Sequence, residues 1–380
     1  MNKTPAVRFI GFAEDWEQRK AKDLCSISTG KSNTQDRVDD GIYPFYVRSP
    51  IVEHSNRYLF DEEAVLTVGD GVGTGKVFHY VNGKYDLHQR VYRMFDFSEE
   101  IKAKYFYYYF SNHFYDRVMS MTAKTSVDSV RYEMIADMDI ALPKIQEQIA
   151  ISDYFDQLDN LITLHQRKYE KLKNIKKSML YKMFPKNGSN VPEIRFKGFT
   201  DAWEQRKLGE YVSITSGEAP SKFDKGTELY VKVDDLNYND KYVVDTQNKV
   251  AEHSTVKRVT KGSVVFPKRG AAIMTNKVRI MGIDSYMDTN MMALTSEKLD
   301  SEFLYNIISK EGLYKIADTS TIPQINNKHV EPYEVTIPSL AEQRRIGAYF
   351  KQLDHLITLH HRKLEKLEQI KQAMLHKMFV

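Results

Sequence analysis

Two segments of the chain carry apolar residues at the spacing of long helices. In the first segment, position a of a heptad is filled by Ile151, Leu158, His165, Leu172 and Met179, and in the second by Ile346, Leu353, His360, Leu367 and Met374. About 38 helical residues at ~1.5 Å each would make a rod of roughly 57 Å. Such a helix must cover its single apolar stripe, and the other copy in the same chain is the nearest partner. The pattern predicts two long helices packed antiparallel.

The stripe also predicts which side chains fill the seam between these helices. The predicted seam residues are Leu158, Leu161, His165, Leu172, Leu353, Leu356, His360 and Leu367. His165 and His360 lie near the middle of their segments, so an antiparallel pair would bring them close together. A polar residue at one a layer commonly fixes helix register. That role is favoured over a metal site or a pH switch, which two histidines alone do not support.

The helical segments belong to a plan that the chain repeats. The phrase "RFIGFAEDWEQRK" at 8–20 returns as "RFKGFTDAWEQRK" at 195–207, an offset of 187 that pairs Trp16 with Trp203. The closing segments that begin at Glu147 and Glu342 align without a gap at an offset of 195. Two copies of this length indicate duplicated domains and not a solenoid.

The regions between these repeated parts mix both kinds of secondary structure. Short β-rich runs such as "YPFYV", "AVLTV", "ELYVKV" and "GSVVFP" alternate with helical patterns at 98–119 and 301–317. We therefore predict an α+β protein with an internal pseudo-twofold repeat. Its expected parts are a first mixed α/β domain at 1–145, a long helix at 146–185, a linker at 186–193, a second similar domain at 194–338 and a second long helix at 339–380.

Composition narrows the class of protein only slightly. Basic residues number 55 and acidic residues 51, so the net charge of +4 says little about nucleic acid. Cys25 is the only cysteine, which excludes an internal disulfide and favours a small buried side chain in a reducing compartment. The first residues lack the apolar core of a secretory signal, and no stretch has the length of a membrane span. A cytoplasmic protein is expected.

Three stretches resemble functional motifs, and the first two are better explained by structure. The segment "TVGDGVGTGKVFHY" at 67–80 has Asp70 where a phosphate loop needs glycine and Val77 where it needs a hydroxyl, so a glycine-rich turn after a strand remains. The aromatic run 105–110 could stack on bases, but its helical spacing favours core packing. The basic helix face at 167–177 is equally compatible with simple solvation and with binding of an anionic partner.

Catalytic and metal-binding patterns are missing from the sequence. No His/Cys cluster has metal-ligand spacing, no nucleophile elbow is present, and neither the tetrapeptide of amino-methyltransferases nor a glycine signature for S-adenosylmethionine occurs. We expect no catalytic residue, no metal and no cofactor in this chain. The sequence indicates a protein that binds and does not catalyse.

The duplicated plan resembles the specificity subunits of type I restriction-modification enzymes over nearly the whole chain. The resemblance is carried by the opening phrases around Trp16 and Trp203 and by "MDIALPKIQEQIAISDYFDQLDNLI" and "YEVTIPSLAEQRRIGAYFKQLDHLI", in which a strand reaches proline, Glu-Gln follows and a long helix begins. The string "TSVDSVRYEMIADMDIALP" at 125–143 also resembles the usual end of the family's first recognition domain.

The resemblance implies two target recognition domains that each read half of a split double-stranded DNA site, held apart by the helices. Two methyltransferase subunits would dock on the repeated parts and methylate adenine with S-adenosylmethionine. Restriction or translocase subunits would supply ATP-driven steps. Two identical partners explain why the docking parts repeat, and two different half-sites explain why the recognition domains diverge. The alternative is a coiled-coil protein-interaction adaptor that does not bind DNA.

If the chain binds DNA, basic residues of the two domains should contact phosphates and base edges. The candidates in the first domain are Lys31, Arg48, Arg57, Lys76, Arg90 and Arg93. Those in the second domain are Lys222, Lys232, Lys268, Arg269, Lys277 and Arg279.

Overall fold

The structure is a computed structural model, and it describes residues 4–71, 73–121, 129–186, 188–318 and 322–379. The chain divides into two compact units. The first unit comprises Met1–His165 and Lys363–Val380, and the second comprises Gln166–Arg362. The first four residues of the string 125–143 lie outside the described residues. Each unit contains one mixed domain and one end of each long helix.

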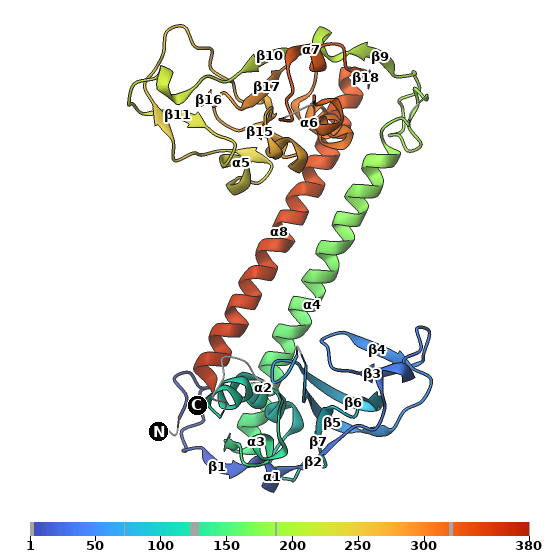
Figure 1. Cartoon of the computed structure of the whole chain (residues 1–380), viewed down its shortest axis with the longest axis vertical. Coiled ribbons are helices and arrows are strands. Elements are labelled where there is room, and N and C mark those ends of the chain that lie inside the picture. Colours follow the sequence, from blue (N-terminus) through green and yellow to red (C-terminus); the bar gives the residue numbers. More distant parts are fainter. Residues whose placement is uncertain (1–3, 72, 122–128, 187, 319–321, 380) are drawn as a thin grey trace. The chain divides into compact units, whose positions relative to one another are not determined.

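The first unit is built on a six-stranded sheet with the order β2-β7-β5-β6-β3-β4 (Figure 1). Its strands are β2 (Ser26–Thr29), β3 (Tyr43–Tyr46), β4 (Val52–Ser55), β5 (Phe60–Val68), β6 (Phe78–Leu87) and β7 (Val91–Phe95). Neighbouring strands are antiparallel except for β3 and β6, which pair in parallel through Tyr46 and Leu87. Three short elements flank this sheet, namely β1 (Glu17–Lys20), α1 (Ala21–Leu24) and α3 (Tyr132–Ala136).

Helix α2 (Ala103–Ser120) supplies the aromatic core of the first unit. Tyr105, Phe106 and Phe110 of the run 105–110 are fully buried, and Phe110 stacks on Phe114 with ring centroids 4.3 Å apart. The run is therefore core and not a stacking surface for bases, as its helical spacing indicates. Cys25 is buried beside this core, and burial raises the pKa of its thiol to about 12.

A two-stranded sheet leads into the first long helix. Strand β8 (Asp139–Leu142) pairs antiparallel with β1, and α4 (Ile145–Lys182) follows directly. Gln148 holds this corner, because its amide donates to the carbonyls of Pro143 and Glu100 and its Oε1 accepts from the backbone N–H of Lys102. The glutamine of the repeated Glu-Gln pair thus ties the helix start to the domain.

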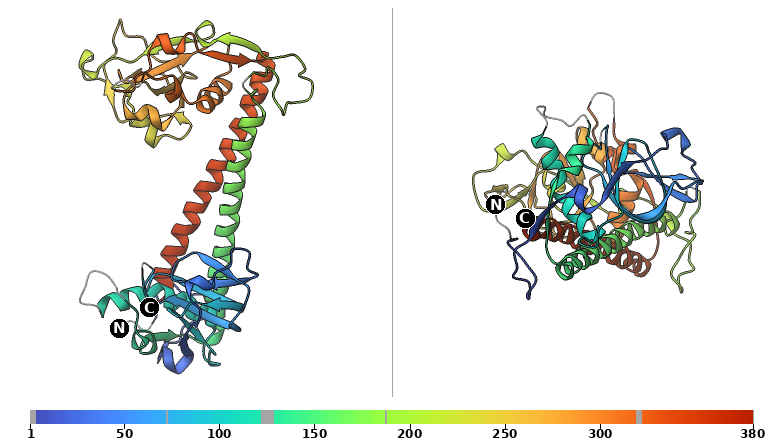
Figure 2. Two further views of the ribbon diagram at one scale, coloured as in Figure 1. Left: turned by 45° about the vertical axis from the view of Figure 1, so that its right-hand side comes forward. Right: turned by 90° about the horizontal axis from the view of Figure 1, so that it is seen from below.

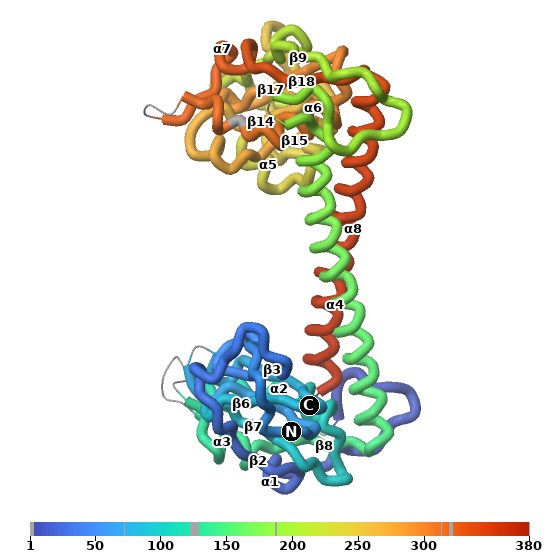
Figure 3. Tube along the Cα trace, turned by 90° about the vertical axis from the view of Figure 1, so that its right-hand side faces the viewer, coloured from blue at the N-terminus to red at the C-terminus, as the bar shows by residue number. Residues whose placement is uncertain are grey.

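The second unit contains three sheets within its described residues, and two of them are larger than the third. The order is β10-β17-β14-β15-β12 in one of the larger sheets and β13-β11-β16 in the other. The strands are β10 (Ser213–Ser216), β11 (Glu228–Val231), β12 (Tyr242–Val243), β13 (Lys249–Val250), β14 (Val264–Pro267), β15 (Arg279–Met281), β16 (Tyr286–Met287) and β17 (Met291–Thr295). Helix α6 (Ser301–Glu311) lies beside β14 and β15 (Figure 3), and the short helices are α5 (Asp235–Tyr238) and α7 (Asn327–Val330).

The corner of the first unit recurs in the second. Strand β18 (Glu334–Ile337) pairs antiparallel with β9 (Glu204–Lys207) and leads into α8 (Leu340–Met378). Gln343 donates to the carbonyl of Pro338 at 3.0 Å and accepts from the backbone N–H of Asp300 at 3.1 Å. The repeat in the sequence is therefore a repeat of the joint between domain and helix.

Helices α4 and α8 run antiparallel and lie side by side within each unit (Figure 2). In the first unit, Phe155 stacks on Phe379 and Asp159 pairs with Lys371, so rising numbers in α4 meet falling numbers in α8. In the second unit, Lys176 pairs with Asp354 at 2.5 Å, and the ring of Phe184 lies 6.1 Å from that of Phe350. The predicted α+β fold with two long antiparallel helices is confirmed.

The predicted seam residues differ in how deeply they lie. Leu158 and Leu353 are buried, and Leu172 and Leu367 pack half-buried against the cores of their units. Leu161 is 43% exposed and Leu356 is half-buried, so neither fills a buried layer. His165 is half-buried in the first unit and His360 in the second. The two Asp–Lys pairs between the helices are polar seam contacts that the apolar pattern did not reveal.

Candidate nucleic-acid interface

Four loops of the first unit meet at one edge of its sheet. We call residues 30–33, 47–50, 69–71, 73–76 and 88–90 the first edge. Backbone hydrogen bonds join the loops to one another and to the strands: His88 donates to the Tyr46 carbonyl at 3.0 Å, Gln89 to that of Ser32 at 2.8 Å, and Gly69 to that of Arg90 at 2.8 Å. The edge is thus a connected backbone scaffold and not a set of independent loops.

Gly30 lets two of these loops approach closely. A Cβ atom at this position would lie 2.1 Å from the carbonyl oxygen of Leu87. No larger residue fits without moving the backbone at the end of β6. The glycine therefore keeps Lys31 and the loop after β2 against the loop that carries His88 and Arg90.

Five of the six basic candidates in the first domain lie at or beside the first edge with exposed side chains, namely Lys31, Arg48, Arg57, Lys76 and Arg90. Arg48 and Arg90 both contact Asp70, at 3.4 and 3.7 Å. Arg57 donates to Asp36 at 3.0 Å and to the Ser32 hydroxyl at 3.1 Å. Lys76 lies over the ring of Tyr115, 4.6 Å from its centroid. The glycine-rich segment thus forms the predicted turn after a strand; its Val72 lies outside the described residues.

Arg93 does not belong to this set. Its guanidinium pairs with Glu62 and lies between the rings of Phe60 and Phe95, 3.9 and 3.5 Å from their centroids. Its side chain is only 11% exposed. These contacts favour a structural role for Arg93 over the predicted DNA contact, because ring stacking and an ion pair already occupy the group.

The second unit repeats several backbone hydrogen bonds of the first edge. We call residues 217–220, 232–234, 268–270 and 288–290 the second edge. Asp288 donates to the Val231 carbonyl at 2.9 Å, and Lys268 donates to that of Asn290 at 2.8 Å, as His88 and Gly69 do in the first unit. A Cβ at Gly217 would lie 2.0 Å from the carbonyl of Asp288, so this glycine matches Gly30.

Four candidates of the second domain lie at or beside this edge: Lys222, Lys232, Lys268 and Arg269. Lys222 is exposed and pairs with Glu218 at 3.1 Å, and Lys232 lies over the ring of Tyr230. Lys268 is half-buried, and burial lowers the pKa of its ammonium group. Arg269 is exposed beside it.

Lys277 and Arg279 make contacts that hold the loop around α5. Lys277 contacts the side chain of Asn237, and Arg279 donates to the carbonyls of Leu236 and Asn239 at 2.8 and 3.0 Å. Burial lowers the pKa of Arg279. These contacts favour a structural role for Arg279 over the predicted DNA contact, because its donors serve backbone carbonyls.

The two edges share a backbone but differ in side chains. The matching hydrogen bonds place Asp288 where the first edge has His88, Asn290 where it has Arg90, and Arg269 where it has Asp70. Both edges also have a hydrogen bond from a backbone N–H to the side chain two residues earlier. The N–H of Arg90 donates to His88 Nδ1 at 3.0 Å, and that of Asn290 donates to Asp288 Oδ1 at 2.8 Å. Equal scaffolds therefore present different hydrogen-bonding groups.

Sequence reasoning missed the partners that organise the edges. Asp70 was used only to reject a phosphate loop, and Asp36, His88 and Asn290 gave no signal. The one available clue was the recurrence of glycine at 30 and 217, at the same offset of 187 as the opening phrase. Alignment of the copies beyond that phrase would have placed both edges near this glycine.

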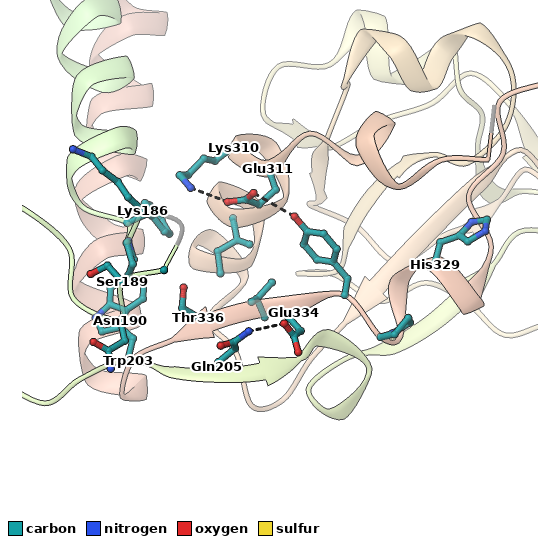
Figure 4. A pocket seen from close by; sticks show the side chains of 17 residues that line it. Lys186, Ser189, Asn190, Trp203, Gln205, Lys310, Glu311, His329, Glu334 and Thr336 are labelled. Atoms are coloured by element: carbon teal, nitrogen blue, oxygen red, sulfur yellow. Dashed lines mark hydrogen bonds and ion pairs between the residues drawn. The ribbon is translucent and has the colours of Figure 1, made fainter.

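A large cavity lies elsewhere in the second unit. It has a volume of about 880 Å³ and is lined by the segment that follows α4, by α6 and by the β9–β18 sheet (Figure 4). Lys310 and Tyr333 both contact Glu311, and Gln205 donates to Glu334. No candidate DNA-binding residue lines it. These contacts brace the joint between domain and helix and form no nucleophile–base pair.

Two other kinds of site are absent from the described residues. No group of three or more His, Cys, Asp or Glu side chains in that part of the chain is placed to hold a metal ion. Among its helices, none combines the length and apolar character that crossing a membrane requires.

Comparison with known proteins agrees with the duplicated architecture. The family model for the type I restriction modification DNA specificity domain matches residues 13–174 and again residues 200–369. The MjaVIII specificity subunit of Methanocaldococcus jannaschii, a type I restriction enzyme subunit, is 24% identical, with 96% of this chain and 92% of the relative covered. The EcoDI specificity subunit of Escherichia coli is 23% identical, over 96% and 88% of the two chains.

A solved structure shares the fold. The S subunit of a type I restriction-modification system from M. genitalium superimposes with a TM-score of 0.72 over 99% of both chains, at 15% identity. Two copies of one backbone scaffold with different polar side chains are typical of a binding protein that has two separate recognition sites. The chain belongs to the type I restriction-modification DNA specificity family, and each half carries one copy of the family's domain. It is a DNA sequence-specificity subunit.

Proposed function

We propose that the chain recognises a bipartite site in double-stranded DNA, with each edge reading one half. The observation that carries the proposal is that the two edges have similar backbone scaffolds but different side chains. A common backbone suits a common task, approach to a duplex, and different donors and acceptors suit different base sequences.

The side-chain chemistry of the candidate residues suits them to two different roles, contact with phosphates and contact with bases. Exposed lysines such as Lys31 and Lys76 are point charges that suit phosphates, which fix the position of the protein without reading sequence. Arginine and asparagine side chains can make two hydrogen bonds to one base in the major groove. In our proposal, residues such as Arg90 and Asn290 supply the sequence preference, and the lysines supply the salt-dependent affinity.

We assign no chemical step to this chain. Two methyltransferase subunits, binding the repeated parts, would methylate adenine with S-adenosylmethionine, and restriction or translocase subunits would use ATP. The complex would act in the cytoplasm, where its DNA substrate lies. Membership of the specificity family supports this division of labour and disfavours an adaptor without DNA.

The proposal is tested on the assembled complex with its methyltransferase. Methylome sequencing of a host with and without the gene should reveal one bipartite methylated motif that depends on the gene. Gel shifts on that motif should weaken steeply from 50 to 200 mM salt, by about 10³- to 10⁵-fold if 6–10 phosphates are contacted. Loss of the gene without any change in methylated motifs would contradict the proposal.

The docking surface for the methyltransferases is proposed from the string "LITLH", which occurs at 161–165 and 356–360. Leu161 and Leu164 are 43% and 45% exposed on α4, and Leu359 is 38% exposed on α8. Neighbouring exposed leucines on a helix suit an apolar helix of a partner. The same surface occurring once in each unit fits two copies of one partner.

We expect Leu164→Asp to weaken one docking site and Leu359→Asp the other, because each buries a charge in an apolar contact. Each single variant should co-purify with one methyltransferase copy, and the double variant with none, by light scattering after gel filtration. The control is Gln166→Asp, two residues away on the other side of α4. Two bound copies in the double variant would show that the partners dock elsewhere.

A further inference from the structure

Two arginines of the first edge share one acid. Arg48 follows β3, Arg90 lies between β6 and β7, and Asp70 follows β5. Nη1 of Arg48 lies 3.4 Å from Asp70 Oδ1, and Nε of Arg90 lies 3.7 Å from Asp70 Oδ2. The two arginine side chains are 48% and 65% exposed, whereas that of Asp70 is 27% exposed. Each carboxylate oxygen thus faces one guanidinium, and both guanidinium groups still reach solvent.

The backbone beneath this group is fixed by several hydrogen bonds. The N–H of Gly69 donates to the carbonyl of Arg90 at 2.8 Å, and the N–H of Arg90 donates to Nδ1 of His88 at 3.0 Å. Val130 donates to the carbonyl of Gly69 at 2.7 Å from the other side. Asp70 and Arg90 therefore sit on backbone that is held in place before any ligand arrives, which reduces the entropy lost on binding.

An acid at this place is unfavourable for simple phosphate binding. Asp70 would repel a phosphate and cancels one of the two positive charges beside it. Orienting a guanidinium, however, requires an acceptor on one side of its fork, so that the remaining N–H groups point in a defined direction. The carboxylate is therefore better explained by aiming the arginines than by attracting the DNA backbone.

We propose that Arg48 and Arg90, aimed by Asp70, read guanine in the half-site of the first domain. The proposal rests on the proposed function and deepens it by naming the base. Guanine presents two acceptors, N7 and O6, in the major groove, and a guanidinium fork matches both. Asp70 acts as a positioning residue and contacts no base. The second edge lacks this arrangement, since Arg269 replaces Asp70 and Asn290 replaces Arg90.

The decisive variants are Arg48→Lys and Arg90→Lys. Lysine keeps the charge and any phosphate contact, but a single ammonium group cannot form the two-pronged bond. Tested in the complete methyltransferase complex, each variant should lower the preference for guanine at one position of the first half-site by about 5- to 150-fold, as 1–3 kcal/mol implies. The second half-site, the spacer and the salt dependence should stay unchanged.

Asp70→Asn separates positioning from simple charge. Removing the acid adds one net positive charge, so non-specific DNA should bind more tightly, while guanine preference at the same positions should fall. A merely structural role would weaken both kinds of binding together. The matched control is Arg258→Lys, which alters an arginine paired with Glu228 at the far end of β11 from the second edge. This control should leave both half-sites unchanged.

Clear outcomes would overturn the inference. A first half-site without a guanine on either strand excludes it, and so does an unchanged guanine preference in both lysine variants. Thermal unfolding of each variant identifies misfolded proteins, and loss of binding to both half-sites together would mark such a protein. Absence of any bipartite motif in the wild-type complex would instead remove the proposed function itself, so the two failures can be told apart.

Discussion

Exchange of residues 21–143 for the matching region of a relative is expected to change one half of the recognised DNA site completely and to leave the other half unchanged. All four loops of the first edge lie within this segment, and the backbone hydrogen bonds of their described residues join them to one another and to other residues of the same unit. The backbone hydrogen bonds of the second edge likewise join residues within 217–325. No described hydrogen bond connects the two sets.

The exchange keeps the joint that the repeat preserves. Gln148, the opening phrase up to Lys20 and all of α4 stay in place. The new domain must supply a strand equivalent to β8 that pairs with β1, and backbone groups that bond Gln148 as those of Pro143, Glu100 and Lys102 do. Methylation mapping of the exchanged protein gives the result directly. The reciprocal exchange of 208–338 is the control and should change only the other half. A simultaneous change of both halves would show that the domains do not read independently.

The fold was largely predictable from the sequence because its longest elements carry the strongest signals. The heptad recurs along the whole of each segment of about 38 residues. The bounds of α4 and α8 were therefore predicted close to those observed. The burial of Tyr105, Tyr108 and Tyr109 likewise follows from helical spacing. Such patterns indicate which face of a helix or strand is buried, and they can be read within one continuous segment of the chain.

The candidate interface was predictable only in part, because it depends on contacts between distant loops. Arg90 and Arg93 are three residues apart in the sequence, yet Arg90 reaches solvent and Arg93 is enclosed by Phe60 and Phe95. Composition cannot separate the two, since the enclosing rings come from both β5 and β7. The partner of Arg48 and Arg90 lies in a third loop, and no spacing rule links Asp70 to either arginine.

The repeat showed which residues recur but not which ones pair. Arg8 begins the first opening phrase and Glu147 begins the first closing segment, 139 residues later. In the structure, Nε and Nη2 of Arg8 donate to Oε1 and Oε2 of Glu147 at 2.6 and 2.7 Å. Arg195 makes the same two-pronged contact with Glu342 at 2.7 Å for both bonds. In each copy, the first residues of the two recurring segments form one ion pair.

Replacement of Arg8 by methionine is therefore expected to destabilise the first unit strongly. The side chain of Glu147 is only 1% exposed, so loss of Arg8 leaves a buried carboxylate without its cation. Removing one partner of a buried pair costs about 3–5 kcal/mol. For a unit of this size, that corresponds to a fall in melting temperature of roughly 6–20 °C. The measurement is thermal unfolding followed by circular dichroism, with Arg195→Met as the equivalent variant of the second unit.

Three companion variants make the cause explicit. Arg8→Lys should fall between wild type and Arg8→Met, because it keeps the charge and loses the two-pronged geometry. The double variant Arg8→Met/Glu147→Leu should recover most of the loss, since an apolar pair can replace a buried ion pair with little change in stability. Arg19→Met, which removes an exposed pair with Glu17, should shift the free energy of unfolding by less than about 1 kcal/mol. If the double variant were no more stable than Arg8→Met, the helix start would depend on Arg8 for packing and not for charge.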